Sequence, residues 1–145
     1  LPIYALSANG RFISLNLING KRNWTVDISG INTPLISGNQ IYLLNENSKL
    51  ICLNKTTGEV YWITQLKKYK RGSKASNLNL WLGPYAINNA LYLISYFGEL
   101  IAIAPTSGEI LETRNLGLNG VMVPPIILSD RVYIVDGNSN AYKFE

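Results

Sequence analysis

The sequence predicts an all-β protein, a β-propeller of four-stranded antiparallel blades that forms a partial ring of about three and a half to four blades. An ungapped pattern of turn residues recurs after four tyrosines, Tyr4, Tyr42, Tyr92 and Tyr133. No segment keeps an apolar period of about 3.6 residues, so we expect essentially no helix. The runs that contain the tyrosines (IYAL, IYLL, LYLI and VYIV) are apolar at consecutive positions, which is typical of strands buried on both faces.

The repeat is complete between residues 41 and 62, where a polar turn, a turn glycine and a tryptophan follow Tyr42. The same offsets hold after Tyr4, and after Tyr92 they hold for the glycine, while Glu112 replaces the tryptophan. The structural repeat residues are therefore Gly20, Trp24, Gly58, Trp62 and Gly108. Units of about 40 residues cannot bury their apolar faces alone, so we expect their sheets to stack face to face.

The first unit spans approximately residues 1–30 and the second 31–66. Asn9-Gly10 and Asn19-Gly20 separate apolar runs in the first unit, and Asn-Gly is a strong hairpin signal because both turn positions need positive φ. Pro34 suits the start of a strand, where no ladder N–H is donated. We expect strands at residues 3–7, 12–16, 24–28, 34–37, 40–44, 49–54 and 59–64.

The third unit spans approximately residues 81–116 and the fourth 117–145, which lacks a last strand. Residues 67–80 interrupt the repeat with a polar segment that we interpret as an inserted surface loop. In these two units we expect strands at residues 84–87, 90–96, 99–104, 109–115, 121–128, 131–136 and 140–144. The apolar residues from Leu78 to Leu82 favour an early start for the third blade.

Small residues occupy one shared position of the first three units, Ser14, Cys52 and Ala102, and would let neighbouring sheets approach closely. Lys143 stands there in the last unit and predicts a less covered face. The single cysteine excludes an internal disulfide and a cysteine-rich metal site. In an apolar strand it is expected to be a small buried residue rather than a reactive thiol.

The net charge of +4 comes from one segment. Residues 67–74 hold five of the 13 basic residues and no acidic one. We interpret this segment either as a solvated insertion or as a contact for an acidic protein or lipid surface, because an aromatic residue ringed by cations suits a recognition rim. Nucleic-acid binding is disfavoured, since aromatic residues do not alternate with the cations. The candidate partner contact consists of Lys67, Lys68, Tyr69, Lys70, Arg71 and Lys74.

The sequence offers no catalytic constellation. It has no histidine, which excludes Ser-His and Cys-His pairs and the commonest metal ligand. The carboxylates are scattered at turns, and no local spacing supports a paired-carboxylate site. We therefore predict no catalytic, cofactor-binding or metal-binding residues, and no run approaches the ~18 apolar residues of a membrane span.

The segment of each unit that reaches the tryptophan has a small residue, Asp or Asn two positions later, Thr-Gly and then Trp. In the second unit these are Cys52, Asn54, Thr57-Gly58 and Trp62. This pattern resembles the repeat of pyrroloquinoline-quinone-type propellers, and within them the lipoprotein family of the bacterial outer-membrane β-barrel assembly machinery. The resemblance implies a non-catalytic scaffold, the C-terminal half of an expected eight-bladed ring, that binds the barrel subunit peripherally at the periplasmic face of the outer membrane, with no cofactor and no nucleic acid.

Two alternatives stay open, a fragment of a quinone-dependent dehydrogenase and a propeller scaffold with another partner. The dehydrogenases hold their quinone over calcium with carboxylate and amide ligands and stack it on adjacent cysteines. Here the repeat's usual Asp is Asn16, Asn54 and Ala104, and no cysteine pair exists. The start at Leu1 resembles the inside of a strand, so we expect the native beginning to be missing. The open sheet edges predict self-association or pairing with the missing half.

Overall fold

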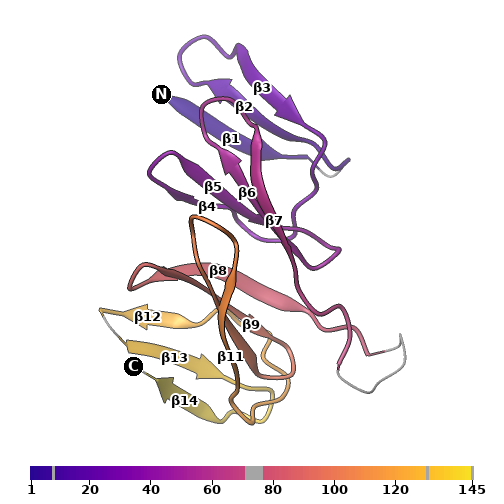
Figure 1. Cartoon of the computed structure of the whole chain (residues 1–145), viewed down its shortest axis with the longest axis vertical. Coiled ribbons are helices and arrows are strands. Elements are labelled where there is room, and N and C mark those ends of the chain that lie inside the picture. The colour runs from indigo at the N-terminus through magenta and orange to yellow at the C-terminus, as the bar shows by residue number, and fades with distance from the viewer. Residues whose placement is uncertain (8, 71–76, 130, 145) are drawn as a thin grey trace. The chain divides into compact units, whose positions relative to one another are not determined.

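The computed structural model describes residues 1–7, 9–70, 77–129 and 131–144. Within these ranges the regular secondary structure consists of β-strands joined by turns and loops. There is no helix in them, and so none that could cross a membrane. The chain forms two compact units, Leu1–Leu66 and Lys67–Glu145, each with two antiparallel sheets (Figure 1). The all-β prediction is confirmed.

In the first unit every strand pairs with its neighbour in the chain. One sheet consists of β1 (Pro2–Leu6), β2 (Phe12–Asn16) and β3 (Arg22–Val26). The other consists of β4 (Leu35–Ser37), β5 (Gln40–Leu44), β6 (Lys49–Asn54) and β7 (Val60–Gln65). The second sheet is therefore a complete four-stranded blade.

The second unit repeats this meander. Its four-stranded sheet consists of β8 (Trp81–Ile87), β9 (Ala90–Ser95), β10 (Glu99–Ile103) and β11 (Ile110–Asn115). Its three-stranded sheet consists of β12 (Ile126–Leu128), β13 (Arg131–Val135) and β14 (Ala141–Phe144). Most strands begin and end within one or two residues of the predicted positions.

One turn is built the same way in all four sheets. The backbone N–H at its end donates to a side-chain oxygen four residues earlier, and the acceptors are Ser7, Asn45, Ser95 and Asp136. The residue three positions after each acceptor has positive φ, and these residues are Gly10, Ser48, Gly98 and Ser139. The sequence repeat reveals the position with positive φ but not the position of the side-chain acceptor, although Ser, Asn and Asp at a fixed offset are the residues that close such turns.

A bulge sets the position of the repeat tryptophan. The register shifts after Ser14, after Cys52 and after Ala102, at the same place in three sheets. Each small residue consequently lies opposite the residue at the tryptophan position, as Ser14 does opposite Trp24 and Cys52 opposite Trp62. Cross-strand neighbours share a face, so a small side chain leaves room for the indole ring.

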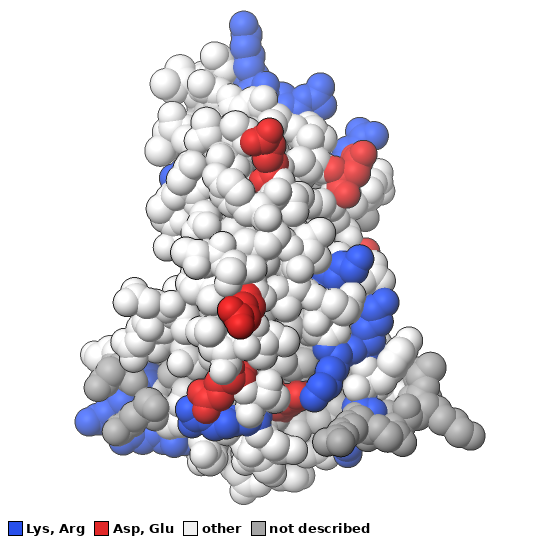
Figure 2. All heavy atoms as spheres, in the orientation of Figure 1, with Lys and Arg blue, Asp and Glu red and all other residues white. Residues whose placement is uncertain are grey.

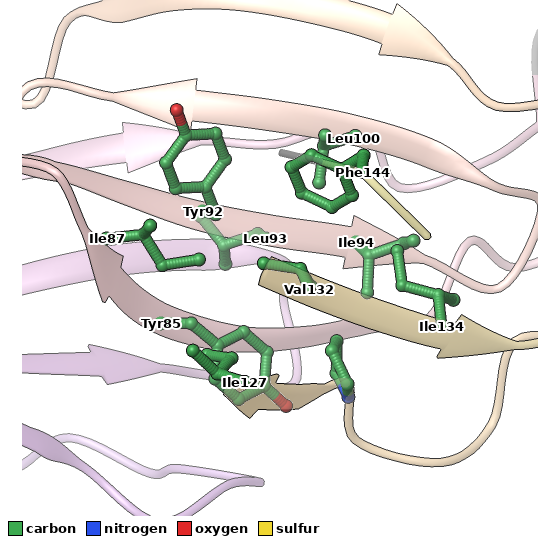
Figure 3. A pocket seen from close by; sticks show the side chains of 11 residues that line it. Tyr85, Ile87, Tyr92, Leu93, Ile94, Leu100, Ile127, Val132, Ile134 and Phe144 are labelled. Carbon is green, nitrogen blue, oxygen red and sulfur yellow. The ribbon is translucent and has the colours of Figure 1, made fainter. Parts of the chain in front are cut away.

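Each unit has its own apolar core between its two sheets. The first core consists of Phe12, Trp24, Ile41, Leu43, Ile51 and Leu53. The second consists of Ile94, Leu100, Leu118, Val121, Val132 and Ile134. In the second unit apolar side chains of both sheets converge and leave only about 10 Å³ of free space (Figure 3). That volume is about one water probe, so this space is packed core and not a ligand site.

Two predictions about strands are wrong in part. Residues 41–44 of β5 are buried throughout, but β1 is not buried on both faces, since Tyr4 and Leu6 pack on the core while Ile3 is 43% exposed. β13 alternates in the same way. The strand expected from residue 121 begins only at Ile126, because Pro124 and Pro125 have no N–H to donate to a ladder.

Candidate functional site

The described ends of the segment that interrupts the repeat are bonded to each other through their backbones. Lys70 N–H donates to the Asn77 carbonyl at 3.1 Å, and Asn79 N–H donates to the Lys68 carbonyl at 2.8 Å. Between them Tyr69 and Leu78 form an isolated antiparallel bridge. The two ends of the predicted loop 67–80 therefore form a short hairpin stem. Arg71 and Lys74 of the predicted partner contact lie outside the described residues.

Trp81 anchors this stem to the blade. The indole is 2% exposed, and its Nε1–H donates to the Lys67 carbonyl at 2.9 Å. One residue earlier, the Leu80 carbonyl accepts from Tyr96 N–H at 2.7 Å. The base of the hairpin is thus held by the first strand of the blade and by the turn that follows β9.

The predicted contact residues divide into two kinds. Lys67 Nζ lies 2.5 Å from Glu99 Oε1, and Lys70 Nζ lies 4.9 Å from the centre of the Phe97 ring. Because the Lys67 side chain is half exposed, we expect its ion pair to contribute roughly 1 kcal/mol or less to stability. Lys68 and Tyr69 are exposed. Two of the lysines therefore contact their own blade, and their neighbours face solvent.

Beside these lysines the blade end is hollowed. The hollow, about 360 Å³, is lined by Lys67, Lys70, Asn79, Phe97, Glu99, Thr113 and Asn115, and we name it the blade-end groove. Five of these residues were missed by sequence reasoning. They come from the stem, the β9–β10 turn, the start of β10 and the end of β11, and only the fold brings such distant segments together.

Asn79 is the most unusual member of the groove. It is 2% exposed, and its Oδ1 has no hydrogen-bond partner. Most buried polar atoms in proteins are paired, so an orphaned acceptor beside a hollow requires a reason. The described part of the chain contains one other such atom, Thr25 Oγ1, which does not line this groove.

The visible surface carries charges of both signs. Figure 2 shows basic and acidic side chains interspersed over a mostly uncharged face, without one continuous basic area. The described lining of the groove has two lysines and one glutamate, and thus one net positive charge.

The repeat residues lie at blade contacts and turns. Trp24 Nε1–H donates to the Lys55 carbonyl at 3.0 Å, and its ring lies against Gly58, where an added Cβ would be 2.8 Å from Trp24 Cδ2. Trp24 thus packs on the turn of the neighbouring blade. The Trp62 ring centre is 5.9 Å from that of Tyr42. Gly20 and Gly108 both have positive φ.

The repeat positions do not fit a calcium-bound quinone. Asn16 Oδ1 accepts the Ile18 N–H at 2.9 Å, and Asn54 Oδ1 accepts the Thr56 N–H at 2.8 Å, so both oxygens close turns. Trp24 is buried between blades. Among the described residues, no group of three or more His, Cys, Asp or Glu could hold a metal ion.

The pKa shifts of Cys52 and Asp136 likewise indicate structural roles for these two residues. Burial raises the pKa of the Cys52 thiol to about 11, which keeps it protonated at neutral pH. Hydrogen bonds from the side chain and backbone of Asn140 hold the pKa of Asp136 below its ordinary value. A protonated thiol is a poor nucleophile, and a carboxylate that closes a turn is not placed to transfer protons.

Comparison with known proteins agrees with the blade architecture. The sequence model of the family described as outer membrane protein assembly factor BamB matches residues 2–64. The assembly factor BamB of Yersinia pestis is 25% identical over 142 residues, which cover 98% of this chain and 34% of the relative. The chain therefore spans about a third of the length of the curated relatives that it matches. The resemblance indicated by the sequence, to the family of this assembly factor, is confirmed.

Solved structures show the fold. BamB from Moraxella catarrhalis superposes with a TM-score of 0.74 at 16% identity, covering 99% of this chain and 46% of that one. The quinohemoprotein alcohol dehydrogenase of Comamonas testosteroni gives a TM-score of 0.62 at 16% identity, covering 78% of this chain and 19% of that one. Likenesses at this identity show a shared fold and no shared chemistry. The predicted β-propeller class is confirmed.

Proposed function

Because the chain is a β-propeller of quinone-type repeats that resembles BamB, we propose that it belongs to a non-catalytic scaffold subunit of the outer-membrane protein assembly machinery. The protein binds the barrel subunit of that machinery, peripherally and at the periplasmic face of the outer membrane. The observation that carries this proposal is the match to the assembly factor over nearly the whole chain.

The packing of the blades supports a scaffold. The strands between the sheets are used for mutual packing, and Ile41, Leu43 and Ile94 are at most 1% exposed. The turns at the blade ends are held by repeated side-chain hydrogen bonds, as at Asn45 and Asp136. Rigid turns on a packed support lose little freedom when a partner binds, which favours affinity.

A direct test uses the full-length protein and the purified periplasmic repeats of the barrel subunit. We expect saturable binding in biolayer interferometry. Protein that lacks residues 1–145 serves to measure how much of the binding this region contributes. If the full-length protein shows no binding to the repeats, the proposed partner is wrong.

The dehydrogenase alternative has its own assay. Titration of pyrroloquinoline quinone with calcium should leave the fluorescence of the three tryptophans, Trp24, Trp62 and Trp81, unchanged, apart from the inner-filter absorption that a free tryptophan control measures. Saturable quenching with calcium-dependent alcohol oxidation would show that the chain belongs to an enzyme.

A further inference from the structure

The blade-end groove contains an acceptor that the protein does not use. Asn79 is 2% exposed, its backbone N–H is bonded to the Lys68 carbonyl, and its Oδ1 has no partner. A buried oxygen that has given up its bonds to water destabilises the folded chain. An unused acceptor in the wall of a hollow is the arrangement expected where a ligand donates a hydrogen bond.

The rest of the wall suits a peptide with negative charge. Lys67 and Lys70 carry positive charge in the lining, Glu99 offsets one of these charges, and Phe97 offers an apolar ring. Asn115 Oδ1 already accepts the Gly117 N–H at 2.9 Å, so its amide N–H₂ is the group that can donate to a ligand. The groove thus offers an acceptor, a donor, an apolar surface and cations.

We propose that the blade-end groove binds an extended acidic peptide segment of the partner protein. This inference rests on the proposed function and names the partner chemistry at this site. A backbone N–H of the peptide donates to Asn79 Oδ1, a backbone carbonyl accepts from Asn115, and an acidic side chain lies near Lys70. Extended peptides present such N–H and C=O groups at regular spacing.

A lipid phosphate fits this groove less well. Phosphate oxygens only accept hydrogen bonds, so a phosphate beside Asn79 Oδ1 would place acceptor against acceptor. Acidic peptides carry donors and anions in one ligand. Access requires that Lys67 leave Glu99 and that Lys70 leave the Phe97 ring, and both side chains are exposed and long.

The test measures the affinity of the chain for a fluorescein-labelled short peptide of alternating glutamate and valine. We expect saturable fluorescence anisotropy, and about tenfold weaker binding for Asn79→Leu, because a single buried hydrogen bond is worth about that factor. Lys70→Glu should also weaken binding. Lys21→Glu makes the same change of charge at an exposed lysine of the first unit and should leave the affinity unchanged.

Folding and binding are separated by a second measurement on each variant. Leucine has the branching and the number of side-chain heavy atoms of asparagine and removes the unpaired oxygen, so Asn79→Leu should keep or increase the urea midpoint while it weakens peptide binding. A purely structural Asn79 would not separate the two readouts. Unchanged peptide affinity in Asn79→Leu would overturn the proposal that the groove binds the peptide. An equal loss of affinity in Lys21→Glu would also overturn it, because that result indicates general charge attraction.

Two further experiments distinguish the inference about the groove from membrane binding and from the proposed function. Binding to anionic phosphatidylglycerol vesicles that Asn79→Leu and Lys70→Glu weaken, without any binding of the glutamate peptide, would assign the groove to a membrane surface and overturn the inference. If the full-length protein binds the barrel repeats and the groove variants bind them equally well, only this inference falls. If the full-length protein does not bind the repeats at all, the proposed function falls first.

Discussion

Replacing Trp24 tests whether the repeat tryptophan holds neighbouring blades together. The side chain is 9% exposed, and its ring packs on Phe12 with centroids 5.4 Å apart and on Tyr4 at 5.9 Å. Its indole N–H also reaches the Lys55 carbonyl in the next blade. Truncation of a buried tryptophan costs about 3–5 kcal/mol, a large share of the about 5–15 kcal/mol that a domain has. We expect Trp24→Ala to lose that amount.

The measurement is urea unfolding followed by far-ultraviolet circular dichroism, because tryptophan fluorescence changes with the substitution itself. Trp24→Phe keeps the ring contacts and loses the N–H donor, so it should cost about 1–2 kcal/mol. Glu112 occupies the same repeat position in the third blade, on the exposed strand β11, and Glu112→Ala should change stability little. A loss below about 1 kcal/mol for Trp24→Ala would refute the role of this residue as a blade contact.

Three more predictions follow from packing and burial. Gly58→Ala should destabilise the chain by more than Gly20→Ala when unfolding midpoints are compared, because both have positive φ but only at Gly58 would a Cβ press on Trp24; equal losses would contradict the contact. The folded-state pKa of Cys52 is raised from 9.0 to about 11, so the unfolded chain loses its proton first and stability should fall as pH rises through that window. Cys52→Ser should weaken that fall in pH-dependent urea unfolding, and an unchanged alkaline slope would show that the thiol is not its source. The apolar residues Met122, Val123, Ile126 and Leu128 are each more than half exposed, so light scattering should show concentration-dependent self-association, and a monomer at every concentration would be incompatible with this.

Local chemistry made most of the fold predictable. Asn19-Gly20 and Thr57-Gly58 mark tight turns within a few residues, and Gly20 and Gly58 have positive φ. Asn19 does not, so the prediction that both positions of the Asn-Gly turn have positive φ is wrong in part. The missed strand start lies where local signals conflict, since the apolar run from Val121 favours a strand while Pro124 and Pro125 prevent pairing. The prediction of burial on both faces is wrong for β1, because the sequence shows that a strand is apolar and does not show which of its faces are covered.

The candidate site was predictable only in part. The charge run marked Lys67 and Lys70, and both line the groove. Nothing near Asn79 in the sequence reveals that its amide becomes buried with one atom unpaired, or that it lines a hollow together with Phe97 and Asn115, which other hairpins supply. Pairing of segments far apart in the chain is a property of the fold, and propensity or periodicity cannot supply it.

The repeat itself limits where specific recognition can arise. Positions shared by the blades have structural tasks, such as Trp24 on the Gly58 turn and Asn54 closing its own turn. A residue with such a task cannot change without loss of stability, so it is a poor place for chemistry particular to one partner. Lys67, Lys70 and Asn79 belong to the segment that interrupts the repeat, and they are free of that constraint. An unpaired Asn79 oxygen that weakens the chain without serving the repeat is therefore best explained by binding, which predicts that stability and affinity change in opposite directions when it is removed.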